Sequence, residues 1–521
     1  MKSRITFASD AKRRGAVLRV MCLALMMVVA SVASLNVALP GIARATGASQ
    51  TQLQWIVDAY ALAFAALLLP AGAVGDRFGR KPVLTVGLSL YGLASLVALF
   101  FHTPAQLIGL RVLMGVGAAL VMPVTLSVVT TVFPPEERGK AVGTWVGVAA
   151  GGGVLGLLAS GLLLQWLSWP SIFVLNVVLA TLALLGTIAI VPATRDSRPP
   201  RLDPIGTLIS VAALAALVYG IIEGPEHGWS DAPTVAALAI GIVGLVVFVV
   251  WELLRSEPML DPRNFLRRGF GAGSLSITIQ FFAAFGFLFL ALPYLQLVKG
   301  YSPLHASGAL LPMALVVMPL SRISPMLAGR VGVRVASATG LALMAVGFIV
   351  LSGLDLGSSY WHFLAGLLPF GAGMALAGAP ATTAIVASMP REKQGIASAV
   401  NDVSRELGGA LGIAVLGSLL NGAYRTGIAH STSALPPTLA HKATASLAAA
   451  QQIGRQLGAP GQQLVLAAQS AFLDGLNHAL LGAAAILLLG ATFVALRAPG
   501  RIESKANAGA QATPSFASEG A

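Results

Sequence analysis

Charge and cysteine are both scarce in this sequence. Only 10% of its 521 residues are charged, whereas 56% are hydrophobic. Soluble domains carry about 25% charged residues, so the composition excludes a soluble domain of any size. There is one cysteine, Cys22, which excludes an intrachain disulfide.

Motifs for catalysis and ATP use are also missing. The phosphate-loop pattern G-x-x-x-x-G-K-[ST] does not occur, so the chain by itself is not an ATP-driven pump. There is no H-E-x-x-H, and the seven histidines are dispersed, which argues against a metal or hydrolase site. The sequence therefore predicts neither an enzyme nor a cofactor-binding or metal-binding protein.

Two weak signals can be set aside. The net charge of +13 would suit a nucleic-acid partner, but the basic residues are scattered among short loops, and we expect no such partner. The glycines at 151, 153 and 156 fit a dinucleotide-binding pattern, but they lie inside an apolar run with no preceding strand.

Long apolar runs dominate what is present. Runs of roughly 20 residues recur along the chain, the length needed to cross ~30 Å of hydrocarbon. We therefore predict an all-α polytopic membrane protein with 14 transmembrane helices. The first run is too long for the core of a signal peptide and is taken as an uncleaved helix. The predicted helices cover 18–40, 52–74, 82–101, 104–132, 140–165, 169–192, 204–222, 232–252, 269–297, 305–328, 333–353, 359–388, 395–420 and 474–496.

The distribution of basic residues predicts the orientation. With these helices, 25 of the 33 Lys and Arg residues fall on the side of the two termini and five on the opposite side. The protein is expected in the cell (inner) membrane. Because cytoplasmic loops are enriched in Lys and Arg, both termini are expected on the cytoplasmic side. The five on the outer side are Arg44, Lys299, Arg425, Lys442 and Arg455.

A weak internal repeat predicts two related halves. Pro40 and Arg77 are 37 residues apart, as are Pro293 and Arg330, and the same offset matches Gly79 with Gly332. Repeated halves are typical of secondary transporters. The predicted organisation is a cytoplasmic N-terminus (1–17), a six-helix bundle (18–192), two inserted helices with their loops (193–268), a second six-helix bundle (269–497) with an outer connector (421–473) that holds a short amphipathic helix near 442–457, and a disordered cytoplasmic tail (498–521).

Charges inside the predicted helices mark candidate functional residues. A charge at mid-bilayer costs at least about 2.5–3.5 kcal/mol on insertion scales, so it usually has a task or a partner. Asp58 and Arg111 lie at matching depths and are predicted to couple protons by pairing or competing during a transport cycle, although a static structural ion pair is the alternative. Asp402, Arg405 and Glu406 form a further charged group, in which Asp402 and Arg405 share a helix face and can neutralise each other.

Small and aromatic residues suggest packing surfaces. Gly147 and Gly151, and Gly152 and Gly156, form small-xxx-small steps and are predicted to make a helix-packing seam. Phe281 and Phe285, with Gln296, are candidates for a substrate cavity, with core or lipid packing of the phenylalanines as the alternative.

The stretch GAVGDRFGRK (72–81) matches the signature G-x-x-x-D-R-x-G-R-K of the major facilitator superfamily, at the place between the second and third helices where that family has it. LIGLRVLMGVGAA (107–119) and LQWIVDAYALAFAALLLPAG (53–72) extend the resemblance to the fourteen-helix drug:proton antiporters, the QacA-like and EmrB-like exporters. The chain departs from that group at Ser31, where an acid is usual, and in its fifth helix, which lacks the Gly-Pro step.

The resemblance implies the major facilitator fold and proton-driven export of drugs, antibiotics or other amphipathic toxic compounds, with the proton gradient as energy source. The expected partners are a small amphipathic substrate, protons and the lipid bilayer, and a monomer is one possible state. The resemblance also implies a conformational latch formed by Gly72, Asp76, Arg77, Gly79, Arg80 and Lys81. In such a latch the aspartate faces the N-terminal end of a helix in the second bundle, here the predicted helix 395–420. The alternatives are a transporter of a specific metabolite on the same fold and a non-transporting membrane sensor.

Overall fold

The structure, a computed structural model, describes residues 2–195, 202–389, 394–433 and 435–500. Those residues are folded into helices and connecting loops, and no strand occurs among them. The helices are α1 (Lys2–Thr46), α2 (Gln50–Phe78), α3 (Arg80–Val97), α4 (Pro104–Val132), α5 (Pro135–Trp166), α6 (Ser171–Ile190), α7 (Pro204–His227), α8 (Ala232–Leu254), η1 (Pro262–Leu266), α9 (Arg268–Pro293), η2 (Tyr294–Val298), α10 (Pro303–Ala309), α11 (Leu311–Val331), α12 (Val333–Leu351), α13 (Tyr360–Ala387), α14 (Gln394–Thr432), α15 (Pro437–Ala445), α16 (Leu447–Leu457) and α17 (Gly461–Arg497).

The long helices make the chain a multi-pass membrane protein. Within the described ranges, 13 spans are long and apolar enough to cross a membrane, with α9 continued by η2 and α10 by α11. The remaining long helix, α3, begins with Arg80 and Lys81, which lower its mean hydropathy, but it packs against α4 and α6 like its neighbours. With α3 included, the described residues form 14 long helices, the number that the sequence predicts.

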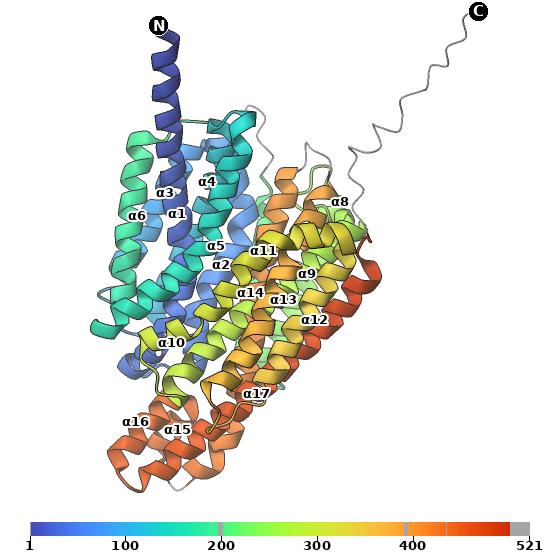
Figure 1. Ribbon diagram of the computed structural model, residues 1–521. Coiled ribbons are helices and arrows are strands. Elements are labelled where there is room, and N and C mark those ends of the chain that lie inside the picture. Colours follow the sequence, from blue (N-terminus) through green and yellow to red (C-terminus); the bar gives the residue numbers. More distant parts are fainter. Residues whose placement is uncertain (1, 196–201, 390–393, 434, 501–521) are drawn as a thin grey trace, which may run out of the picture.

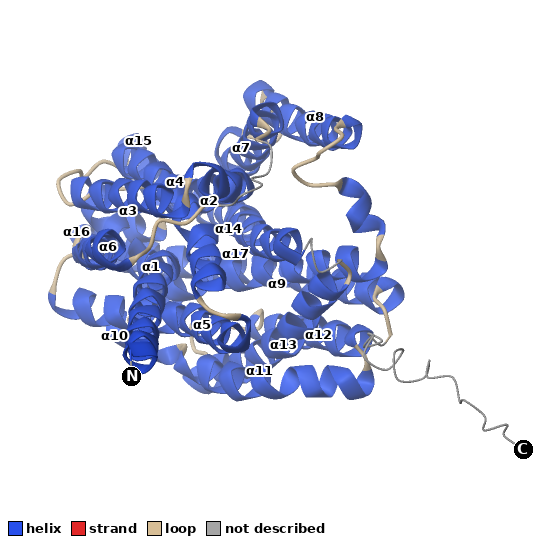
Figure 2. Cartoon of the chain, turned by 90° about the horizontal axis from the view of Figure 1, so that it is seen from above, coloured by secondary structure: helices blue, strands red, loops and turns tan. Residues whose placement is uncertain are grey.

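The helices pack as two bundles (Figure 2). In the first, α1 contacts α4, α5 and α6, α2 packs on α4, and α3 packs on α4 and α6. In the second, α9 contacts α13, α14 and α17, and α12 lies between α13 and α17. The bundles meet where α2 packs on α14, α1 on α9 and α5 on α10. The inserted helix α7 covers the α2–α14 seam, whereas α8 contacts chiefly α7.

The molecule has two distinct ends (Figure 1). The beginning of α1 and the end of α17 lie at one end, which we call the termini face. The short helices α15 and α16 lie at the opposite end, which we call the hairpin face. This naming does not depend on which face is cytoplasmic.

The second bundle differs from the predicted helix boundaries. α14 continues to Thr432 and α17 begins at Gly461, so the segment 421–473 is mostly helical rather than an open connector. The predicted amphipathic helix 442–457 is split at Ser446, whose hydroxyl accepts a hydrogen bond from the backbone N–H of Ala449 and starts α16. The predicted helix 305–328 is divided into α10 and α11, and most of the tail predicted to be disordered, 501–521, lies outside the described residues.

The structure confirms the match between Gly79 and Gly332. Both glycines join two helices with a positive φ, +104° for Gly79 and +92° for Gly332, a conformation that favours glycine. The same offset pairs Lys81 with Arg334. Lys81 Nζ donates to the carbonyl oxygen of Ile188 in α6 (2.8 Å), and Arg334 Nε donates to that of Ala498 after α17 (2.8 Å). Each bundle therefore fixes its equivalent turn to its own last helix.

Candidate functional site

A cavity of about 320 Å³ lies between the two bundles near the middle of their helices. The first bundle contributes α1, α2, α4 and α5, and the second contributes α9, α11, α13 and α14. Phe281 and Phe285, the two predicted cavity residues, line its wall with Phe64, Phe287 and Phe370. The volume falls in the range of sites for drug-sized ligands, and most of the wall is apolar.

Two charged residues of α14, Arg405 and Glu406, also border this cavity. The Arg405 guanidinium lies 4.7 Å from the centroid of the Phe281 ring and 3.8 Å from the Asp402 carboxylate. Glu406 is only 9% exposed, and within the described structure its Oε2 atom has no hydrogen-bond partner. The wall of the cavity therefore carries one basic side chain and one acid, and the acid has a buried oxygen without a partner among the described residues.

Gln296 does not belong to this cavity, so its predicted place is wrong. It lies in η2 near the hairpin face, and its Nε2 donates to the carbonyl oxygen of Val37 in α1 (3.0 Å). The residue comes late in its membrane span, about eight residues beyond Leu288, the last cavity-lining residue of α9, which moves it roughly 12 Å along the helix axis. Gln296 closes the bundle junction instead of lining the central site.

Asp58 is completely buried in α2. Gln54, one turn before it, donates through Nε2 to the carbonyl oxygens of Ala414 (2.7 Å) and Ile413 (3.1 Å) in α14. Leu62, one turn after it, packs in a cluster with Ala414. Because residues four apart share a helix face, Asp58 lies on the side of α2 that faces the second bundle. Neither carboxylate oxygen has a hydrogen-bond partner in the described structure.

Arg111 is equally buried but bonds elsewhere. Its Nε donates to the carbonyl oxygen of Ile56 in α2 (3.1 Å), and its Nη1 donates to Ser31 Oγ in α1 (3.3 Å). The guanidinium stacks over the Tyr60 ring at 4.1 Å. Arg111 thus holds α1, α2 and α4 together, and in this conformation it makes no ion pair with Asp58.

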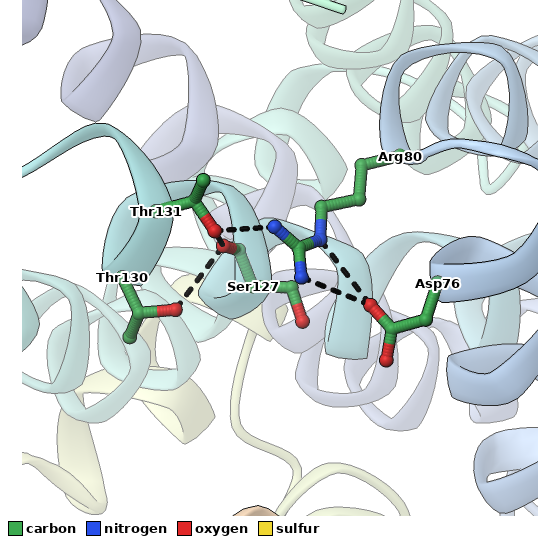
Figure 3. A network of polar contacts seen from close by, with 5 residues as sticks. All are labelled: Asp76, Arg80, Ser127, Thr130 and Thr131. Atoms are coloured by element: carbon green, nitrogen blue, oxygen red, sulfur yellow. Dashed lines mark hydrogen bonds and ion pairs between the residues drawn. The ribbon is translucent and has the colours of Figure 1, made fainter. Parts of the chain in front are cut away.

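The α2–α3 turn carries the predicted latch residues (Figure 3). Asp76 Oδ1 accepts from Arg80 Nη2 (3.0 Å) and Nε (3.3 Å), and Arg80 Nη1 donates to Thr131 Oγ1 in α4. Thr131 in turn donates to the carbonyl oxygen of Ser127 (2.8 Å). The network therefore fixes α2 and α3 to α4, all within the first bundle.

The other members of the signature have separate places. A Cβ on Gly72 would be 3.6 Å from Pro123, an ordinary contact with α4, and Arg77 is exposed. Asp76 bonds to Arg80. Residues 390–393, directly before α14, lie outside the described residues, so the predicted latch between the bundles stays a prediction. The signature acts here as a brace of one bundle.

The predicted glycine seam is only partly correct. A Cβ on Gly156 would lie 2.6 Å from Ala30 Cα, and one on Gly152 would lie 3.6 Å from Met26, so these two glycines face α1. Nothing lies within 4 Å of a Cβ added at Gly147 or Gly151. A helix of 3.6 residues per turn places the two pairs on different faces, and the structure packs one of them.

The hydrogen bonds between the bundles were not anticipated from the sequence. Besides the Gln54 and Gln296 bonds, Asn421 Nδ2 in α14 donates to Thr51 Oγ1 in α2 (3.1 Å). Among the described residues, the bonds that join the two bundles all lie in the half nearer the hairpin face. Carboxamides inside apolar runs are the signal that could have found them, because a buried amide needs a partner.

The family model described as Major Facilitator Superfamily matches residues 21–413. The chain belongs to the major facilitator superfamily. It is 35% identical to the methyl viologen resistance protein SmvA of Salmonella typhimurium, over 87% of this chain and 92% of that protein. It is also 32% identical to the multidrug efflux pump LfrA of Mycolicibacterium smegmatis (92% and 95%) and 35% identical to the multidrug resistance protein Stp of Mycobacterium tuberculosis (76% and 74%). The family is one of transporters, not enzymes.

Solved structures agree with this fold. A bacterial homologue of the human lysosomal transporter Spinster, in an inward-facing and unoccupied conformation, aligns with a TM-score of 0.65 at 18% identity, over 93% of this chain and 97% of that one. The xylose transporter XylE of E. coli, in an inward-open conformation, aligns with a TM-score of 0.53 at 14% identity, over 78% and 90%. At such identities the likeness concerns the fold alone.

Proposed function

We propose that this protein exports small amphipathic toxic compounds, antibiotics among them, in exchange for protons. The central cavity between the bundles carries this proposal, because an apolar and aromatic wall bordered by the charged residues Arg405 and Glu406 suits amphipathic molecules. Relatives that cover most of the chain are named for multidrug efflux and for resistance to methyl viologen.

The distribution of Lys and Arg supports a cytoplasmic termini face in the cell (inner) membrane. The bonds between Gln54 and α14, and between Gln296 and α1, then close the cavity from the outside. The conformation described here is accordingly the one that takes up its substrate from the cytoplasmic side. Alternating access requires these outer bonds to break while new contacts form at the termini face.

Asp58 is the group we assign to proton binding. Burying an ionised carboxylate without hydrogen-bond partners costs free energy. Protonation of Asp58 removes this cost at the surface where the bundles meet. A proton on Asp58 thereby favours contact between α2 and α14, and its loss favours separation. Arg111 serves coupling indirectly, because it fixes the backbone of Ile56 two residues from Asp58.

Asp76 is proposed to act in the other half of the cycle. It lies at the termini face, where the bundles must close when the outer bonds break. We propose that its carboxylate then leaves Arg80 and meets the beginning of α14, whose N-terminal end attracts an anion. Meanwhile the bonds of Arg80 to Thr131 and of Lys81 to Ile188 keep the turn at Gly79 fixed to the first bundle.

The test uses purified protein in proteoliposomes with an imposed pH gradient and a panel of cationic, neutral and anionic compounds. We expect transport of amphipathic compounds that stops when the gradient is collapsed. Asp58→Asn should abolish proton-driven transport, whereas Asp474→Asn, an exposed acid on α17, should leave it unchanged. Unimpaired proton-driven transport by Asp58→Asn would show that Asp58 does not couple protons to transport. Transport by the wild type that does not depend on the pH gradient would favour a uniporter. No transport at all would favour a sensor.

A further inference from the structure

A second hollow lies at the hairpin face, outside the central cavity. It has a volume of about 840 Å³ and is formed by the end of α1, the segment 296–300, α16 and the first turns of α17. An adjoining cavity of about 370 Å³ shares Arg44, Gln451 and Arg455 with it. We call the two together the vestibule. Its wall includes α16, which lies beside α15 at the hairpin face (Figure 1).

The vestibule collects positive charge. Of the five Lys and Arg residues on this side of the membrane helices, three line it, namely Arg44, Lys299 and Arg455. Its lining contains no Asp or Glu among the described residues. The outer side of a membrane protein is usually poor in Lys and Arg, so topology does not account for this concentration.

Arg44 and Arg455 face the same space and repel each other. Both side chains are exposed. Lys299 differs, because its ammonium donates to the carbonyl oxygens of Ser358 (2.6 Å) and Leu356 (3.1 Å). Two guanidinium groups held at one hollow without an acid raise the electrostatic energy of the empty site, and an anion between them removes that cost.

The two arginines belong to different bundles. Hydrogen bonds and close helix packing fix the backbone near each of them. Arg44 lies in the last turn of α1, and Gln296 Nε2 donates to the carbonyl oxygen of Val37 in the same helix (3.0 Å). Arg455 lies on α16, where Gln451 Nε2 donates to the carbonyl oxygen of Leu297 (2.6 Å). Beside Arg455, a Cβ on Gly454 would lie 2.8 Å from the carbonyl oxygen of Gly461, so α16 and α17 pack closely there. The arginines are therefore held on opposite sides of the bundle junction.

We propose that the vestibule binds a phosphate or carboxylate group between Arg44 and Arg455. The planar guanidinium matches both groups with paired hydrogen bonds. A phospholipid headgroup and a dissolved anion carry this same chemistry. Because the bound group joins the two bundles at the hairpin face, it stabilises the conformation described here. The site does not depend on which compound the central cavity transports.

The experiment measures binding to the purified full-length protein. One arm titrates radiolabelled inorganic phosphate into the protein in neutral detergent. The other arm uses nanodiscs of phosphatidylcholine with or without phosphatidylglycerol and counts retained lipid by native mass spectrometry. The variants are Arg44→Gln, Arg455→Gln and the double variant. Lys442→Gln is the matched control, because it removes one positive charge from α15 at the same hairpin face, and Lys442 does not line the vestibule.

We expect wild type and Lys442→Gln to bind alike and each arginine variant to bind about tenfold more weakly, as for the loss of one charge-assisted contact. Binding of free phosphate identifies a small-anion site, and binding of phosphatidylglycerol alone identifies a headgroup site. The proposal is overturned if neither probe binds wild type, or if the double variant binds as tightly as Lys442→Gln. Arg455→Gln, on an exposed helix surface, keeps the test valid should changes at Arg44 impair folding.

Discussion

Gln54 offers the sharpest test of how the two bundles are held together. Its Nε2 donates to the carbonyl oxygens of Ala414 (2.7 Å) and Ile413 (3.1 Å), and all of these atoms are buried. A typical intramolecular hydrogen bond contributes about 0.5–1.5 kcal/mol net, so Gln54→Ala removes about 1–3 kcal/mol from contact at the hairpin face. The ratio of the closed to the open hairpin face should fall by roughly 5- to 150-fold.

The assay is a pair of distance measurements by electron paramagnetic resonance in a Cys22→Ser background. Spin labels at residues 168 and 463 report on the hairpin face, and labels at residues 140 and 330 report on the termini face; all four positions are exposed. Gln54→Ala should increase the population of long distances at the hairpin face and of short distances at the termini face.

Gln280→Ala is the matched control for this prediction. Gln280 is also a buried glutamine whose Nε2 donates to a backbone carbonyl, that of Met374, but both residues belong to the second bundle. The control should lower the unfolding temperature without shifting the distances. Unchanged distances in Gln54→Ala, or an equal shift in Gln280→Ala, would refute the assignment of Gln54 as a contact between bundles.

Three further substitutions test the other assignments. Gly156→Leu should lower the unfolding temperature, because overpacking against Ala30 costs about 1–3 kcal/mol. Gly147→Leu, where nothing lies within 4 Å of an added Cβ, should not lower it. Equal unfolding temperatures of the two variants would contradict the packing of Gly156 on α1. Asp76→Asn should insert and fold normally, as judged by yield and gel filtration, but transport poorly in proteoliposomes, and normal transport would reduce the α2–α3 turn to a brace. Glu406→Gln should weaken transport of cationic compounds about tenfold, the scale of one charged hydrogen bond, and affect neutral ones less; an equal loss for both would show that Glu406 does not select charge.

Much of the fold follows from the sequence because hydrocarbon thickness sets the length of a membrane helix. The repeat spacing even predicts that Gly332 matches Gly79, and both adopt positive φ. For α15 and α16 the sequence predicts only one short amphipathic helix near 442–457, whereas the structure has two helices that meet at Ser446. They are too short and too polar to be recognised by apolar length, and their stability comes from packing of side chains such as Leu447 and Ile453, which only the tertiary structure reveals.

The candidate site shows the same division. Arg405 and Glu406 could be found from the cost of charge in a membrane, and they border the cavity. Depth along a helix can also be counted, but the direction of a side chain depends on how the helices pack. Asp58 and Arg111 were matched by depth, yet Asp58 lies on the face of α2 toward α14, whereas Arg111 bonds to the backbone of α2 from α4. In this conformation equal depth does not pair them, and pairing during the cycle stays a prediction.

The position of Asp58 suggests a physical role for the inserted helix α7. α7 packs along the seam between α2 and α14, where Trp55 Nε1 donates to Glu223 Oε1 (2.7 Å) and Ser418 Oγ donates to the carbonyl oxygen of Ile221 (2.6 Å). Val218 and Ile222 of α7 fill the same cluster as Leu62, the residue one turn from Asp58. Without α7 this seam would face lipid, where a carboxylate costs at least about 2.5–3.5 kcal/mol. The inserted helix α7 therefore shields from lipid an acid at the junction of the two bundles, which is the surface that the proposed proton coupling requires to open and close.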